Sequence, residues 1–109
     1  MTITDANLAA MSARIIEAVQ PESIILFGSL ARGDATEESD LDLLIVEQED
    51  FTRRSRWREL QTIRKSISDF RIAKDILLYS QNEIEQWRGS LNHVIGHALR
   101  EGKWLYARS

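Results

Sequence analysis

The stretch FGSLARGDATEESDLDL, which runs from Phe27 to Leu43, decides the fold and carries most of the chemistry in the sequence. It begins with a Gly-Ser pair at the end of one apolar run and ends with Asp40 and Asp42 at the start of another. Side chains alternate between the two faces of a β-strand, so these aspartates should project from the same face about 7 Å apart. The stretch therefore predicts two strands joined by a polar turn, with paired carboxylates at the mouth of the second.

Paired carboxylates at this position require a partner. Two carboxylates so close repel each other, and no Lys or Arg lies between Asp34 and Asp50 to pair with them. A bound divalent cation would offset the repulsion between the two carboxylates. Mg²⁺ prefers carboxylate oxygens together with substrate phosphates, as in a metal-nucleotide complex. Asp75, inside the apolar segment Ala73–Tyr79, is the candidate third carboxylate, with which the site could hold two ions.

The Gly-Ser pair has the composition of a phosphate-binding turn. Gly28 lets the backbone come close to a ligand, and Ser29 adds a hydroxyl. The exposed N–H groups of a turn that enters a short helix suit phosphate oxygens. Arg32 follows three residues after Ser29 and could reach the same phosphates, and Ser39 completes the set of nucleotide-binding candidates.

The spacing of apolar residues and turn signals predicts the remaining elements. Strands are expected at Ser23–Phe27, Leu41–Val46 and Ala73–Tyr79. Helices are expected from near Thr4 to Pro21, from about Arg53 to Phe70, from a capping box at Ser80 through Trp87, and from Ser90 through Leu99 to a left-handed Gly102. This order predicts one α/β (α+β) domain over residues 1–109, with a small mixed sheet packed against helices.

The helical periodicity also predicts which side chains form the core. On the two long helices the expected core residues are Leu8, Met11, Ile15, Ala18, Val19, Trp57, Leu60, Ile63, Ile67 and Phe70. The terminal segment Trp104–Tyr106 must either dock on the core or meet a partner, and we expect it and Trp87 in the core.

Composition narrows the class of protein. Hydrophobic residues make up 43% and charged residues 28% of the 109 residues, which is typical of a folded globular domain. No apolar run approaches the roughly 20 residues that cross a bilayer, and the N-terminus lacks the features of a signal peptide, so we expect a cytoplasmic protein. The absence of cysteine excludes disulfides, thiol catalysis and cysteine-ligated zinc.

The net charge of −3 conceals a strong segregation of charge. Eight acidic residues and no basic one lie between Asp34 and Asp50, whereas eight of the fourteen basic residues lie between Arg53 and Lys74. Two solvated surfaces of opposite sign explain this pattern as well as a cation-binding patch beside an anion-binding one does. For the basic helix we expect an acidic partner or plain solvation rather than nucleic acid, since Trp57 is expected in the core and not as a stacking group.

Gly28-Ser29, ten intervening residues, Asp40-Leu41-Asp42 and the later Asp75 resemble the signature of the minimal nucleotidyltransferase (MNT) branch of the DNA polymerase beta superfamily. GSLARGDATEESDLDLLI matches that signature almost throughout, and a looser likeness extends over the whole chain to REGKWLY. The resemblance implies a nucleotidyltransferase fold, in which a mixed sheet is backed by helices and an open face bears the aspartates.

The resemblance also implies roles for single residues. Asp40 and Asp42 would ligate Mg²⁺, and Asp75 would share a metal ion and help to activate the acceptor hydroxyl. Gly28 and Ser29 would hold the β- and γ-phosphates of a nucleoside triphosphate, for which ATP is favoured. The reaction of the family transfers a nucleoside monophosphate, here AMP, to a hydroxyl and releases pyrophosphate.

Many small members of the MNT branch are antitoxins whose partner is a helical HEPN-domain ribonuclease, silenced by AMP attached to a tyrosine, by direct binding, or by both. The chain has room for little beyond a catalytic core, so the acceptor is expected to bring its own recognition surface, which favours a protein partner. Two alternatives stay open: a non-catalytic antitoxin that covers its partner, and transfer to a small hydroxylated molecule such as an aminoglycoside. A homo-oligomer is compatible with the sequence, and no membrane partner is expected.

Overall fold

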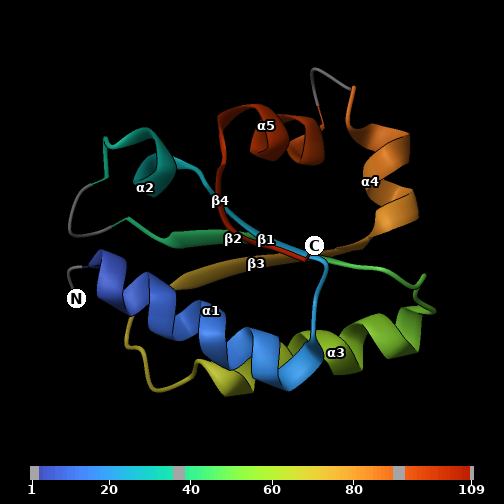
Figure 1. Ribbon diagram of the computed structural model, residues 1–109, viewed down its shortest axis with the longest axis horizontal. Coiled ribbons are helices and arrows are strands. Elements are labelled where there is room, and N and C mark those ends of the chain that lie inside the picture. The colour runs from blue at the N-terminus through green and yellow to red at the C-terminus, as the bar shows by residue number, and fades with distance from the viewer. Residues whose placement is uncertain (1–2, 36–38, 90–92, 109) are drawn as a thin grey trace.

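In the described part of the chain, helices cover both faces of one four-stranded sheet (Figure 1). The computed structural model describes residues 3–35, 39–89 and 93–108. The helices are α1 (Asp5–Val19), α2 (Ser29–Arg32), α3 (Arg53–Ser66), α4 (Gln81–Trp87) and α5 (Val94–Glu101). The two long helices α1 and α3 lie on one face, and the shorter α2, α4 and α5 lie on the other (Figure 1). The predicted α/β (α+β) class is confirmed.

The sheet is mixed and has the order β3-β2-β1-β4. Its strands are β1 (Ser23–Phe27), β2 (Leu41–Glu47), β3 (Lys74–Ser80) and β4 (Lys103–Ala107). β1 is antiparallel to both of its neighbours, whereas β2 and β3 are parallel. Parallel neighbours need a crossover connection, and α3 supplies it. β3 and β4 are therefore the two edges of the sheet.

Apolar layers pack on both faces of the central strands. Ile24 and Leu26 of β1 join the core beneath α1 and α3, whereas Ile25 between them joins the core beneath α4 and α5. The same alternation operates in β2, where Leu43 and Leu44 enter opposite layers. Burial on both faces explains why β1 and β2 read as continuous apolar runs in the sequence.

Side-chain caps fix where the helices begin. The Thr4 hydroxyl accepts a hydrogen bond from the Asn7 N–H at 3.1 Å and starts α1. The capping box predicted at the start of α4 is confirmed, since the Glu83 N–H donates to the Ser80 hydroxyl at 3.2 Å and the Ser80 N–H donates to the Glu83 carboxylate at 2.9 Å. Each such cap contributes about 1 kcal/mol to the stability of its helix.

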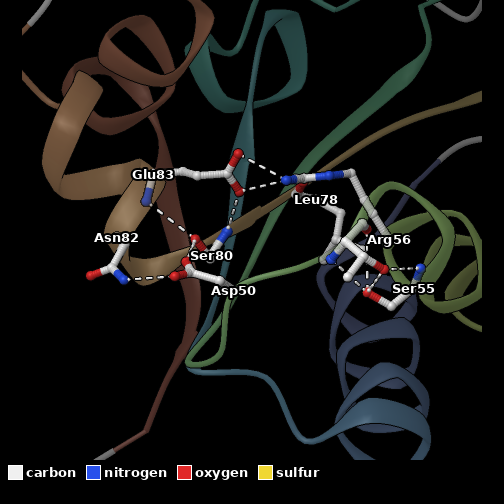
Figure 2. Close-up of polar contacts among 8 residues, drawn as sticks. Asp50, Ser55, Arg56, Leu78, Ser80, Asn82 and Glu83 are labelled. Atoms are coloured by element: carbon white, nitrogen blue, oxygen red, sulfur yellow. Dashed lines mark hydrogen bonds and ion pairs between the residues drawn. The ribbon is translucent and has the colours of Figure 1, made fainter.

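Arg56 ties α3 to β3 and α4 (Figure 2). Its guanidinium donates to both carboxylate oxygens of Glu83, at 2.9 and 2.8 Å, and to the carbonyl of Leu78 at 2.6 Å. Beside this ion pair, the Ser80 hydroxyl donates to Asp50 at 2.7 Å. Arg56 thereby holds the C-terminal end of β3 to α3, and Asp50 holds it to the loop that precedes α3.

The C-terminal segment corrects two predictions. The residues after α5 form β4, an edge strand paired with β1 that the sequence did not predict. Gly102 does end α5, but its φ of −75° is not the expected left-handed value. Glycine is needed there for a different reason, because an added Cβ would lie 2.2 Å from the carbonyl oxygen of Ala98. The predicted cap at Ser90 lies outside the described residues.

Helix α3 and the aromatic residues need correction as well. α3 ends at Ser66 rather than Phe70, although Ile67 and Phe70 are buried as predicted. Trp57 is 63% exposed and Ala18 is also exposed, because both lie at the margin of their helix's apolar stripe. Trp87 and Trp104 are 38% and 50% exposed and are not core residues either. In the described parts of the chain, no helix combines the length and the apolar character that crossing a bilayer demands.

Glu47, at the end of β2, is a half-buried carboxyl whose Oε2 atom has no hydrogen-bond partner among the described residues. Burial, followed by a hydrogen bond and charge repulsion from the neighbouring Glu59, raises the pKa of Glu47 from 4.5 to about 8. The two side chains line a pocket of about 350 Å³ between β2 and α3. The folded state therefore holds a proton here that the unfolded chain releases at a lower pH.

This proton predicts a dependence of stability on pH. Between pH 4.5 and about 8 the folded state binds more protons than the unfolded state, so the free energy of unfolding should fall as the pH rises through this window. Glu47→Gln should reduce that fall by about 1 kcal/mol, a value discounted for partial exposure, in urea titrations at about pH 5 and about pH 8. The control is the exposed Glu49→Gln. Equal behaviour of the two variants would show that Glu47 is not the responsible group.

Candidate nucleotide and metal site

The centre of the candidate site is a pair of carboxylates on neighbouring strands. Asp42 of β2 lies directly opposite Asp75 of β3 in the parallel register, so the two residues are separated by one interstrand spacing, about 4.8 Å. Asp42 shares the face of Leu44, and Asp75 shares the face of Leu77, toward α4 and α5. The structure therefore brings these two predicted residues together on one face of the sheet.

Asp40 stands just outside this pair. It is exposed and immediately precedes β2, which begins at Leu41 as predicted. Burial raises the pKa of Asp42, and the charges of Asp75 and then Asp40 raise it further. Asp40 is thus near enough to act on Asp42, and the three carboxylates repel one another.

Gly28 closes the site from the side of β1. Its φ of 74° lies in the region that favours glycine, and an added Cβ would lie 2.2 Å from Oδ2 of Asp42. The register explains this approach, because Phe27 pairs with Asp42 across β1 and β2. The main chain at Gly28 therefore packs directly against the Asp42 carboxylate. A side chain at position 28 would occupy the space that this carboxylate fills.

The rest of the turn is held by its own main chain. The Ser29 carbonyl accepts hydrogen bonds from the N–H groups of Gly33 and Asp34, at 3.0 and 3.1 Å. Ser29 is half-buried and begins α2, so the turn enters a short helix as predicted. Ser39, also half-buried, lies on the other side of the site immediately before Asp40.

Arg32 supplies positive charge beside the carboxylates. It is exposed and forms ion pairs with Asp34 at 3.3 Å and with Glu101 at 3.5 Å, and these partners raise its pKa. Its charge also opposes the rise in the pKa of Asp42. Exposed ion pairs of this kind contribute little to stability, so Arg32 can exchange them for another anion at small cost.

Two further residues beside the candidate site, Glu101 and Lys74, were not predicted from the sequence. Glu101, the partner of Arg32, comes from α5, which lies 69 positions away along the chain, and no local pattern connects the two. Lys74, next to Asp75, donates to the main-chain carbonyls of Phe70 at 2.5 Å and Ile72 at 3.1 Å, and burial lowers its pKa. Lys74 therefore fixes the chain just before the aspartate and is not free to neutralise it.

The donor set suits a hard divalent cation. All three acidic groups offer carboxylate oxygens, which are the ligands that Mg²⁺ prefers, and their mutual repulsion favours a cation between them. In the part of the chain that the structure describes, no three acidic or imidazole groups already have the spacing of a complete ligand shell. Asp40 and Asp75 are exposed, so their side chains are not fixed by packing.

Comparison with known proteins identifies the family. A family profile described as "Nucleotidyltransferase domain" matches residues 12–101, which include the Gly-Ser turn and all three aspartates. The chain belongs to the nucleotidyltransferase domain family. The resemblance seen in the sequence is thereby confirmed at the level of the family.

Two relatives of this nucleotidyltransferase domain come from Methanocaldococcus jannaschii, and both bear the provisional name of protein adenylyltransferase. One is 70% identical over 30 residues, which cover 28% of this chain and 30% of that protein. The other is 46% identical over 57 residues, which cover 52% of this chain and 54% of that protein. The chain thus spans about half or less of the length of the relatives that it matches.

Solved structures share the fold. A toxin-antitoxin crystal structure with AMP-PNP has a TM-score of 0.63 and 18% identity, with 94% of this chain and 75% of that chain covered. An MNT antitoxin complex with the tri-AMPylated HEPN toxin of Shewanella oneidensis has a TM-score of 0.55 and 18% identity, with 93% and 73% covered. At this level of identity the likeness shows a common nucleotidyltransferase fold.

Two glycines of the site make a matched pair of variants. Gly28→Ala should lower the free energy of unfolding by about 2 to 3 kcal/mol, because it combines a positive φ with a clash against Asp42. Gly33→Ala should cost only about 1 kcal/mol, since its φ is 82° but no atom of the described residues lies within 4 Å of its added Cβ. Chemical denaturation measures both values.

The clash can be tested separately from the backbone strain. In an Asp42→Ala background the cost of Gly28→Ala should approach that of Gly33→Ala, because the carboxylate that the new Cβ meets is gone. Equal costs for the two glycine variants in the wild-type background would show that the turn does not press against Asp42.

Proposed function

We propose that the chain transfers AMP from ATP to a hydroxyl of a protein partner and thereby neutralises a HEPN-type toxin. The observation that carries the proposal is the convergence of Asp42 and Asp75 on one face, with Gly28 leaving that face open. Support comes from the two relatives named as protein adenylyltransferases and from the fold shared with an antitoxin whose HEPN partner is AMPylated.

Asp40, Asp42 and Asp75 would hold Mg²⁺, and two ions are expected. The chemistry fits the site, since carboxylates that repel one another in its absence become ligands in its presence. When bound, Mg²⁺ would neutralise charge on the triphosphate and on the phosphoryl group in transfer.

The chain's own residues position the substrates. Gly28 and Ser29 would present main-chain N–H groups and a hydroxyl to the β- and γ-phosphates, and Arg32 and Ser39 would contact the same nucleotide. Asp75 is exposed at the start of the edge strand β3, so an acceptor can approach it from solvent. Contacts of this kind would hold the nucleotide and the acceptor hydroxyl next to each other for the transfer.

The transfer balances without a further reactant. The acceptor oxygen forms a bond to the α-phosphorus as the bond from that phosphorus to the bridging oxygen breaks, and pyrophosphate leaves with the electron pair. Asp75 takes the hydroxyl proton as the new bond forms. A purely steric antitoxin fits less well, because steric coverage does not need Gly28 and three carboxylates beside one another. Transfer to a small hydroxylated molecule fits less well, because both curated relatives are named as protein adenylyltransferases.

The first test of this function is loss of transfer. When the chain is co-expressed with a HEPN-type protein encoded beside its gene, intact-mass analysis should show AMP on that protein. Asp42→Asn should reduce the added AMP on the order of 100-fold or more, while circular dichroism remains unchanged. The exposed Glu17→Gln on α1 is the charge-matched control. Undiminished modification by Asp42→Asn would eliminate the mechanism.

The second test needs no acceptor. Without divalent cations, Asp42→Asn should raise the free energy of unfolding by about 0.5 kcal/mol, because it removes like charges that face each other across two strands. Added Mg²⁺ with a non-hydrolysable ATP analogue should raise the melting temperature of the wild type and of Glu17→Gln but not of Asp42→Asn. Equal stabilisation of all three proteins would place the ligand elsewhere.

A further inference from the structure

The outer edge of β3 borders a groove beside α3. Among the strands in the described residues, only β2 pairs with β3. Two hollows lie between this edge and α3: one of about 450 Å³ lined by Arg56, Leu60, residues 76–79 and Glu83, and one of about 260 Å³ lined by Arg64, Ser68, Ile72 and Lys74. Residues of β3 line both hollows, and Asp75 is the second residue of that strand.

The main chain of β3 offers hydrogen-bonding groups to this groove. The Ala73 carbonyl accepts from the Leu41 N–H at 2.8 Å and so points toward β2, whereas the Leu78 carbonyl points outward to Arg56. Main-chain groups alternate in direction along a strand, so the N–H and carbonyl of Ile76 also point outward. Arg56 covers the edge at Leu78 (Figure 2), and the stretch nearer Asp75 is left as a template for another strand.

The helix that flanks the groove is cationic and carries an exposed tryptophan. Trp57 is 63% exposed and lies one helical turn from Arg53 and two turns from Arg64. Within residues 3–35, 39–89 and 93–108 no ion pair engages five basic residues of α3, namely Arg53, Arg54, Arg58, Arg64 and Lys65. This surface therefore presents uncompensated positive charge and one large apolar side chain beside a strand edge.

We infer that the groove between α3 and β3 docks an extended, acidic segment of a protein partner, which adds to the sheet as a strand beside β3. Main-chain hydrogen bonds to Ile76 would give affinity, and acidic side chains beside Arg53 and Arg64 would give selectivity. A second copy of the chain fits less well, since two α3 helices would bring like charges together. Nucleic acid would meet the charges and Trp57 but could not continue the strand ladder.

A segment docked in this manner would also place one of its hydroxyl groups beside Asp75 as the acceptor of AMP. This part of the inference rests on the proposed function. In an added strand, the residue opposite Asp75 projects from the same face, with its Cβ about 5 Å from that of Asp75. A serine, threonine or tyrosine at that position would have its hydroxyl near the carboxylate proposed to take its proton. The edge of β3 would thus select which hydroxyl of the partner is modified.

A peptide and two matched double variants test the docking surface. The probe is a short fluorescein-labelled peptide that alternates glutamate with valine around a central tyrosine, and its lysine counterpart is the charge control. The acidic peptide should bind the intact chain, and Trp57→Ala with Arg64→Glu should weaken binding by about tenfold or more. Trp104→Ala with Lys103→Glu, which changes a tryptophan and a basic residue on the opposite edge strand β4, should alter binding less than about twofold.

Amide hydrogen exchange then distinguishes a peptide that pairs with β3 as a strand from one that is held only by its charge. The acidic peptide should slow exchange of the Ile76 N–H, which points outward, with little effect on the Leu77 N–H, which faces β2. The inference is overturned if Ile76 exchange is unchanged, if both double variants weaken binding equally, or if an oligoadenylate RNA binds more tightly than the peptide. Asp42→Asn should still bind the acidic peptide, because Asp42 does not line the groove. Failure of AMP transfer by the wild type with peptide binding retained would therefore contradict the proposed function and leave the docking inference standing.

Discussion

The parallel pairing of β2 with β3 is the interaction on which the rest of the structure depends. It sets Asp42 opposite Asp75, and it requires the long crossover through α3 whose buried Ile63 and Ile67 complete one apolar layer. A slip of one residue in this register would turn Asp75 toward the opposite layer and dismantle the site without altering the composition of the sheet. The alternation of apolar residues on both strands opposes such a slip, because both faces are packed.

The same pairing brings like charges together at the starts of β2 and β3. Asp42, Asp75 and Asp40 repel one another, Lys74 is occupied by main-chain carbonyls, and Arg32 opposes the repulsion only in part. Gly28 adds a left-handed conformation at the same point. Two apolar layers, helix caps and the Arg56 network offset these costs, so the stable part of the fold supports a strained, acidic edge that is suited to a bound cation.

Local patterns in the sequence predicted local features well. β1 and the capping box of α4 begin where the sequence places them, because apolar runs and reciprocal caps depend on residues close together in the chain. Non-local features escaped prediction: β4 is recognisable only through its pairing with β1, and the ion pair of Arg32 with Glu101 leaves no trace in either segment. Trp57 was misplaced because periodicity does not define how wide a buried stripe is. For the site, the position of Asp75 inside a third apolar strand predicted that it could reach the face of Asp42, and the parallel register places the two opposite each other. Asp40 lies immediately before β2, which begins at Leu41 as predicted.

The central claim, that the three carboxylates at the ends of β2 and β3 hold a divalent cation, is tested most directly with Mn²⁺ as a paramagnetic substitute for Mg²⁺. In the presence of a non-hydrolysable ATP analogue, substoichiometric Mn²⁺ should broaden the amide signals of residues 28–29, 41–43 and 75–76 first, and Asp42→Asn should abolish that pattern. Broadening centred instead on the acidic pocket of Glu47, Asp50 and Glu59 at the far end of β2 would contradict the account.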